Sequence, residues 1–205
     1  MTTEKKRTSS LFSENNLTHP ARESSDDLPD ETTVYFVRHA VPDSHLTNGH
    51  LTSQGYAQAK KIAGLLSQEL HNKAGDKKPL LVVSPTVRTR ETADPIASKL
   101  GVRPLIHSAF SEEYLADTNS IFFSPAFLRR HVASQKILRA FRQIVRANHG
   151  KTIVIVTHGN VIRTLTGKLL RKSYDEMSKT PVVCGSVTTL RIRGHAISVD
   201  KYTEV

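Results

Sequence analysis

Three short apolar runs, each followed by a segment with helical periodicity, constrain the fold of this chain more than any other feature. The runs occupy residues 34–37, 80–83 and 152–156 and consist almost wholly of aliphatic and aromatic residues. Because polar residues do not alternate with apolar ones inside them, each run is typical of a strand buried on both faces. Strands that alternate with helices pair mainly in parallel and carry helices on both faces of the sheet. The sequence therefore predicts a three-layer α/β/α fold with a largely parallel central sheet.

Helical periodicity and turn residues predict the remaining elements. Thr52 is a suitable helix N-cap, and Gly101 follows the last turn of another predicted helix. The predicted helices run from about residue 53 to 71, from 87 to 100, from 126 to 148 and from 160 to 170. A short strand is predicted at 104–107 and a closing hairpin at 185–192 and 196–201, whereas residues 108–125 give no clear pattern.

The 205 residues are predicted to form one folded domain behind a disordered leader. Residues 1–31 are rich in polar and acidic residues and poor in large apolar ones, so we expect order to begin at Thr33 and the domain to span 32–205. The leader has four Lys/Arg and seven Asp/Glu, which gives it a net charge of −3. Because the whole chain has a net charge of +10, the domain carries +13. Such a cationic domain attracts anions, whether nucleic acid or phosphorylated molecules.

Composition also indicates which cellular compartment and which cofactors to expect. No apolar run approaches the roughly 18–20 residues that a membrane span requires. Cys184 is the single cysteine, which excludes an intramolecular disulfide and indicates a reducing compartment, so we expect a cytoplasmic protein. The sequence has no cluster of acidic residues suited to Mg²⁺, and we expect neither a metal nor a cofactor.

Each of the three strong strands ends in residues suited to binding phosphate. The first leads into Arg38 and His39, the second into Arg88, and the third into His158 and Asn160. Parallel strands place their carboxyl ends at one edge of the sheet, where α/β proteins bind ligands. Arginine offers forked donors to phosphate oxygens, imidazole adds a donor or a nucleophile, and the helix opening at Asn160 points backbone N–H groups at an anion. The pattern therefore predicts a phosphate pocket at this edge.

Several segments, in this order, resemble the histidine phosphatase superfamily, branch 1, whose members share the phosphoglycerate-mutase-like fold. They are residues 38–40, 51–59, 84–93 and 157–160, followed by 185–188 at the entry to a C-terminal strand. The matches span about residues 33–192. The resemblance implies a phosphoric monoester hydrolase that works through a phosphohistidine intermediate.

The resemblance also implies a role for each matching residue of the pocket. His39 is similar to the nucleophile that accepts the phosphoryl group. Arg38, Arg88 and His158 are similar to the residues that bind the phosphate, with His158 counted among the catalytic residues as well. Asn160, at the start of its helix, is expected to join the substrate-binding residues.

The proton donor of the family is a glutamate between the second-arginine and second-histidine segments, in the pattern apolar residue, any residue, Glu. Glu112 fits this pattern after Phe110 and Ser111, so it is the expected donor. Glu113 is the neighbouring alternative.

Two departures from the family bear on function. Ala40 stands where the family has a glycine, and alanine disfavours a positive φ, so the local backbone could differ. The loop between His39 and Leu51 is short, which favours hydrolysis over the chemistry of the glycolytic mutases. The short loop and residues 160–163 are similar to those of phosphohistidine phosphatases and the mitochondrial mutase-family protein phosphatase. The expected substrate is therefore a phosphoprotein or a small phosphometabolite.

Three other functions deserve comparison. A non-catalytic module that binds phosphorylated ligands would keep the arginines without the nucleophile or the acid, and a phosphoglycerate-mutase-type phosphotransferase would share the whole pocket. A nucleic-acid binder would use Arg139, Arg142 and Arg146, which share one face of a helix. A solvated helix face explains these arginines without a ligand, and no aromatic residues interleave with them for stacking on bases. We therefore expect neither a nucleic-acid nor a membrane partner, and the oligomeric state stays open.

Overall fold

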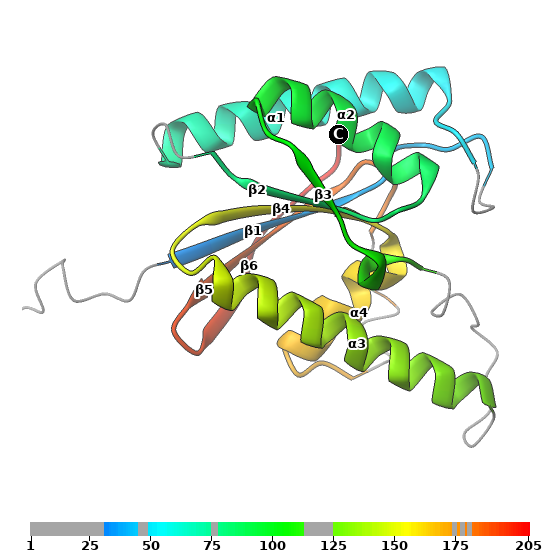
Figure 1. Ribbon diagram of the computed structural model, residues 1–205, viewed down its shortest axis with the longest axis vertical. Helices are drawn as coiled ribbons and strands as arrows, with labels where there is room; N and C mark the ends of the chain where they lie inside the picture. The colour runs from blue at the N-terminus through cyan, green and yellow to red at the C-terminus, as the bar shows by residue number, and fades with distance from the viewer. Residues whose placement is uncertain are drawn as a thin grey trace, which may run out of the picture.

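Six strands of the computed structural model form one sheet in the order β3-β2-β4-β1-β5-β6 (Figure 1). The structure describes residues 31–44, 49–74, 78–112, 125–173, 176, 179 and 182–205. The strands are β1 (Glu31–Arg38), β2 (Leu80–Val83), β3 (Pro104–Ile106), β4 (Thr152–Thr157), β5 (Val187–Arg193) and β6 (Ala196–Thr203). Strands β1 to β4 pair in parallel, and the hairpin of β5 and β6 joins antiparallel to β1. The predicted, largely parallel α/β sheet is confirmed.

Helices cover the sheet on both faces, as Figure 1 shows. Helices α1 (Ser53–Ala74) and α2 (Val87–Leu100) lie against one face, and α3 (Pro125–Ala147) and α4 (Gly159–Leu169) lie against the other. A short 3-10 helix, η2 (Ser108–Phe110), follows β3. The helix ends match the caps expected from the sequence: the hydroxyl of Thr52 accepts from Gly55 N at 3.0 Å, and Gly101 closes α2 at φ +62°.

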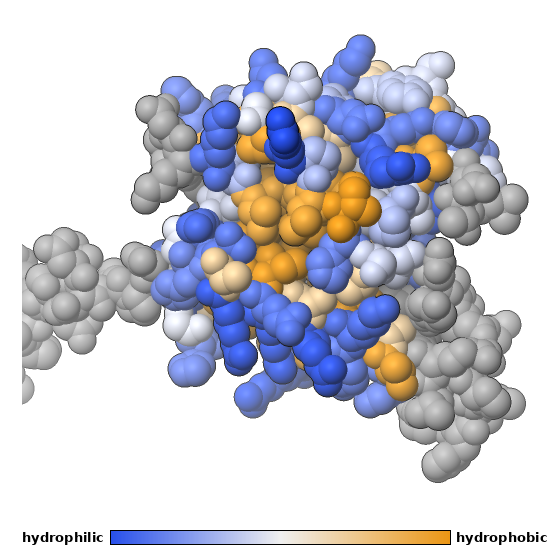
Figure 2. Space-filling model, viewed as in Figure 1, coloured by the Kyte–Doolittle hydropathy of each residue, from blue (hydrophilic) through white to orange (hydrophobic). Residues whose placement is uncertain are grey.

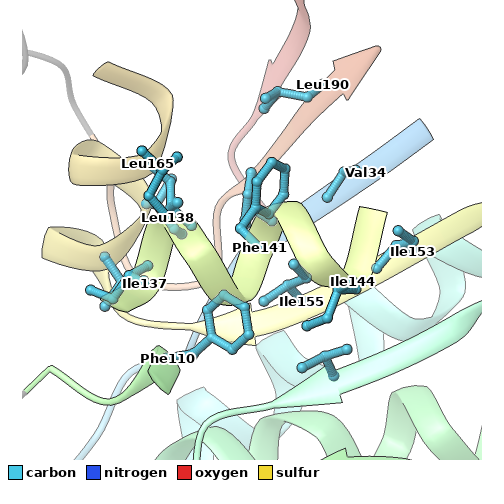
Figure 3. Packing of buried hydrophobic residues seen from close by; sticks show 14 of the residues in the cluster. Val34, Phe110, Ile137, Leu138, Phe141, Ile144, Ile153, Ile155, Leu165 and Leu190 are labelled. Atoms are coloured by element: carbon cyan, nitrogen blue, oxygen red, sulfur yellow. The ribbon is translucent and has the colours of Figure 1, made fainter. Parts of the chain in front are cut away.

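The central strand β1 joins the two hydrophobic layers because its side chains alternate between them. Val34 and Phe36 pack with α3 and α4, whereas Tyr35 and Val37 pack with α1 and α2. All four side chains are at most 1% exposed. Figure 3 shows the α3/α4 layer, with Phe141 in the midst of residues from α3, α4 and the strands. A sheet held this firmly from both sides gives its strand ends fixed positions.

The sheet has an exposed edge at β3. All three residues of β3 are exposed, and Leu105 and Ile106 each keep 47% of their surface accessible. Figure 2 shows apolar side chains gathered across the middle of the face on which β3 lies in Figure 1, with hydrophilic ones around them. The short length of β3 limits the number of free backbone groups that this edge presents.

Some boundaries differ from those expected. Strand β1 begins at Glu31, two residues before Thr33, because its pairing with β5 continues to Arg193 and the Glu31 carboxylate binds Arg191 at 2.8 Å and Arg193 at 2.7 Å. Strand β5 begins at Val187 rather than at Gly185, which lies in a turn with φ +77°. The expected leader, apart from Glu31, and most of the unassigned segment 108–125 lie outside the described residues.

Candidate active site

The three strand ends singled out in the sequence meet at one edge of the sheet. Strand β4 lies between β1 and β2, and the backbone pairing continues beyond the strands: His39 N donates to Thr157 O at 2.9 Å, and Ser84 N donates to Val156 O at 3.0 Å. His39, His158 and the segment that leads to Arg88 are therefore neighbours. The predicted convergence of strand ends agrees with this arrangement.

The His39 ring is held in one orientation and one tautomer. Its side chain is 2% exposed, and Nδ1 lies 2.9 Å from the carbonyl oxygen of Ala40. A carbonyl only accepts, so Nδ1 carries the hydrogen and Nε2 keeps its lone pair. Burial lowers the pKa of His39 to about 3, assisted by the charges of His158, Arg38 and Arg88 and opposed by the hydrogen bond to Ala40. The ring is thus neutral near pH 7.

Besides the bond from His39 N to Thr157 O, three other parts of the chain hold the backbone around His39. The carbonyl of His39 accepts from Gly185 N at 3.0 Å, and Ala40 N donates to the hydroxyl of Thr92 at 3.0 Å. Val41 N donates to the side-chain oxygen of Gln58 at 3.2 Å. Among the described residues, Arg171 is the only non-glycine with a positive φ, so Ala40 adopts a backbone conformation that alanine tolerates. Alanine in place of the family glycine therefore brings no strain of this kind.

His158 lies edge to face against His39, with ring centroids 5.3 Å apart, and is fully buried. Its Nε2 is 2.9 Å from the hydroxyl of Ser84, and its Nδ1 is 3.3 Å from Oε2 of Glu112. An ionised carboxylate only accepts, so Nδ1 donates to Glu112 and the Ser84 hydroxyl donates to Nε2. Burial lowers the pKa of His158, against the raising effect of Glu112. His158 thus presents an N–H to the pocket.

The two arginines reach the pocket from different elements. Arg88 comes from the first turn of α2, and its Nη2 lies 3.3 Å from His158 Nδ1. Arg38 ends β1, donates to the carbonyl of Val182, and keeps a buried Nε that makes no hydrogen bond within the described residues. Its guanidinium lies against Gly159, where an added Cβ would come within 3.3 Å of Nε. The glycine after His158 therefore leaves room for Arg38.

Glu112 completes the cluster, whereas Glu113, the alternative acid, lies outside the described residues. Oε2 of Glu112 is 3.5 Å from Arg88 Nη2, and Oε1 accepts from Asn160 Nδ2 at 3.0 Å. Burial would raise the pKa of Glu112, but the hydrogen bond from His158 and the charges of His158, His39 and Arg88 outweigh it and lower that pKa to about 2. The carboxyl group is ionised near neutral pH.

The structure brings together every expected site residue that it describes and adds others that the sequence did not assign to the site. Ser84, Gln58, Thr92 and Gly185 orient the two histidines or the backbone beside them. Ser84 directly follows β2, and its position at a strand end was the one available signal for it. Gln58 and Thr92 lie inside helices that are distant in sequence from the backbone they bind, so no local pattern indicates their contacts.

Neither a metal site nor a membrane span is found in the part of the chain that the structure describes. No group of three His, Cys, Asp or Glu side chains there is arranged to hold a metal ion. None of the helices there combines the length and apolar character needed to cross a bilayer.

Comparison with known proteins gives a family match and several similar folds. The model of the Histidine phosphatase superfamily (branch 1) matches residues 34–121 and 129–205. None of the curated protein sequences compared with the chain gives a match.

Solved structures similar to this chain include two of phosphoserine phosphatase from Entamoeba histolytica. A mutant in complex with phosphoserine has a TM-score of 0.64 at 20% identity and covers 83% of this chain and 96% of its own. A complex with 3-phosphoglyceric acid has a TM-score of 0.67 at 19% identity, with 85% and 98% covered. A putative alpha-ribazole-5'-P phosphatase from Escherichia coli has a TM-score of 0.64 at 17% identity, with 82% and 94% covered. These likenesses establish the fold.

Proposed function

The chain belongs to the histidine phosphatase superfamily, branch 1, and on that premise we propose that it is a phosphomonoester hydrolase with His39 as its nucleophile. The observation that carries the proposal is the state of the His39 ring. Its Nδ1 hydrogen is bound to Ala40 O, so the lone pair of Nε2 is available beside Arg38, Arg88 and His158. These three donors neutralise the negative charge of a bound phosphoryl group.

In the first step, Nε2 of His39 attacks phosphorus and the bond from phosphorus to the ester oxygen breaks. Glu112 gives its proton to the departing oxygen, which leaves as an alcohol. In the second step, water attacks the phosphohistidine, the Glu112 carboxylate takes a proton from that water, and the P–N bond breaks. Inorganic phosphate and the original His39 ring result, so protons and bonds balance over the cycle.

Glu112 must gain a proton before it acts as an acid, because its pKa in the free protein lies far below neutrality. Binding of the substrate causes Glu112 to take up this proton. A phosphate dianion that binds Arg88 and His158 takes over the groups that stabilise the carboxylate and adds negative charge next to it. Both effects raise the pKa of Glu112 in the complex and favour its protonated form.

The substrate is proposed to be a phosphomonoester, either a small phosphometabolite or a phosphoprotein. Proteins of similar fold include a phosphoserine phosphatase and a mycobacterial glucosyl-3-phosphoglycerate phosphatase. Their names favour testing phosphorylated hydroxy acids and amino acids first, with phosphopeptides as the competing class. A panel ranked by kcat/KM decides between the two. A phosphotransferase would yield a phosphorylated product in place of inorganic phosphate, and a binding module would release none.

Trapping the covalent intermediate tests the proposal directly. In Glu112→Gln, a nitrophenyl phosphate still phosphorylates His39 because its leaving group hardly needs an acid, whereas hydrolysis slows by about 10²–10⁴-fold. We expect a burst of nitrophenol and a protein label that is labile in acid and stable in alkali. The His39→Ala variant is the control and must carry no label. Quenched Glu112→Gln protein without a label at His39 would contradict the covalent mechanism.

A further inference from the structure

We propose that Arg163 and Asn160 are positioning residues that dictate which oxygen of Glu112 carries the catalytic proton. The inference rests on the proposed phosphatase function. It concerns a chain of two hydrogen bonds along α4: Arg163 Nη1 donates to Asn160 Oδ1 at 3.3 Å, and Asn160 Nδ2 donates to Glu112 Oε1 at 3.0 Å.

The direction of this chain follows from the chemistry of its first member. A guanidinium only donates, so the atom of Asn160 that faces Arg163 must be the amide oxygen. The NH₂ group of Asn160 then has to face Glu112. Arg163 and Asn160 lie three residues apart on α4, within reach on the same helix face. Arg163 thereby removes the ambiguity between the two ends of the amide.

The two oxygens of Glu112 consequently have different surroundings. Oε1 accepts from an amide that cannot accept in return, so a proton on Oε1 would oppose the N–H of Asn160. Oε2 faces Arg88 and His158, the groups proposed to bind the phosphate. When bound substrate raises the proton affinity of Glu112, the proton goes to Oε2, on the side of the pocket.

The backbone that carries Glu112 is anchored independently of Asn160. The Thr157 hydroxyl donates to the carbonyl of Phe110 at 2.8 Å, two residues before Glu112. Loss of Asn160 or Arg163 therefore frees the Glu112 side chain to rotate without releasing its segment. The expected defect is in proton donation and not in the binding of phosphate.

Two esters that differ in their need for an acid separate these effects. The kcat/KM of each ester reports only the steps up to phosphorylation of His39. Slow hydrolysis of the intermediate therefore does not change this value. In Arg163→Ala we expect kcat/KM for an alkyl phosphate to fall at least tenfold and that for a nitrophenyl phosphate to fall less than threefold. Arg163→Lys keeps a donor and should recover part of the loss. Arg139→Gln removes an exposed arginine of α3 and should change neither value.

Asn160→Asp gives a second, independent readout. An aspartate cannot donate to Oε1, and its negative charge raises the pKa of Glu112 and draws the proton toward Oε1. We expect the alkyl ester to lose at least tenfold in kcat/KM. The basic limb of the pH profile of kcat, which reports the pKa of Glu112 in the complex, should move to higher pH. A purely structural role for Asn160 would not move that limb upward.

The outcomes distinguish this inference from the proposed function. A wild-type protein that turns over neither ester overturns both. Suppose instead that the wild type is active, and that in Arg163→Ala and Asn160→Asp the kcat/KM values for the two esters fall equally or not at all. That result overturns the positioning role alone. If Asn160→Asp does not fold, the ratio of the two esters in Arg163→Ala, compared with Arg163→Lys, decides the question.

Discussion

Replacing Glu112 by glutamine should make the site bind a divalent oxyanion more tightly near neutral pH. Oε2 of Glu112 lies 3.3 Å from His158 Nδ1 and 3.5 Å from Arg88 Nη2, the donors proposed to hold a phosphate. An anion that binds there must displace the carboxylate or tolerate its charge. Glutamine keeps the shape of the side chain and removes the charge, so this opposition disappears.

The size of the effect follows from the separation of the charges. Two unit charges at 4 Å interact by about 1 kcal/mol in bulk water and about 4 kcal/mol at the effective dielectric constant near a protein surface. A dianion doubles these figures. The Glu112 side chain is 24% exposed, so solvent screens part of the interaction and the lower end of the range applies. We expect about 2–3 kcal/mol, or on the order of 10²-fold in Kd.

The pH dependence has a definite sign. Bound anion raises the pKa of Glu112 above its low value in the free protein, so the complex binds more protons than the free protein. Affinity in the wild type should therefore rise as pH falls from about 7 to about 5. The pKa of His39 and that of His158 are also lowered in the free protein, and both rise on binding, so Glu112→Gln keeps a dependence of the same sign with a smaller slope.

Calorimetric titration with sulfate measures both the Kd and its dependence on pH, because sulfate keeps its two charges between about pH 5 and pH 7. Glu204→Gln removes an exposed carboxylate and serves as the control for a change in net charge. A Glu112→Gln protein that binds sulfate no more tightly than the wild type at neutral pH would refute the proposed competition. So would an unchanged slope of affinity against pH.

Three further outcomes are expected. Excess EDTA should leave turnover of a nitrophenyl phosphate intact, since arginine and imidazole neutralise the phosphate; activity lost and then restored by Mg²⁺ would contradict this. Gly185→Ala, at φ +77° and with its added Cβ against the Gln58 side chain, should lower the free energy of unfolding by about 1–3 kcal/mol in denaturant titrations, whereas Gly64→Ala, with nothing within 4 Å, should raise it slightly. Removal of residues 1–29 should leave kcat unchanged, and a large fall in Tm would show that they pack on the domain.

The parts of the fold that carry strong local signals were predictable. The continuous apolar runs identified the central strands, and the parallel arrangement then implied that Arg38, Arg88 and His158 would meet. The start of β1 was not predictable, because Glu31 is ordered by Arg191 and Arg193 from the other end of the chain. Local sequence marks hydrophobic burial, but it does not reveal which distant partner will satisfy a polar group.

The same limit applied within the site. Asn160 is predicted to bind substrate, and nothing in the sequence indicated the hydrogen bond that its amide also makes to Glu112, between α4 and the segment after η2. Gln58 carried no local sign of its role, although it joins Val41 to the carbonyl of Cys184 and so ties the two loops beside His39. Such links depend on three-dimensional arrangement and have no periodic trace in the sequence.

The position of β1 between β4 and β5 also has a consequence during synthesis. An emerging chain presents β1 before the other strands of the described sheet, and both neighbours of β1 lie far downstream, at residues 152–157 and 187–193. At typical translation speeds of about 5–20 residues per second, roughly eight to thirty seconds pass before both neighbours of β1 have been synthesised. During that interval its apolar side chains and backbone groups are uncovered, which makes them a target for chaperones and for aggregation. An interrupted polypeptide would therefore carry Arg38 and His39 on an unpaired strand, as a hazard to the cell and without a working pocket.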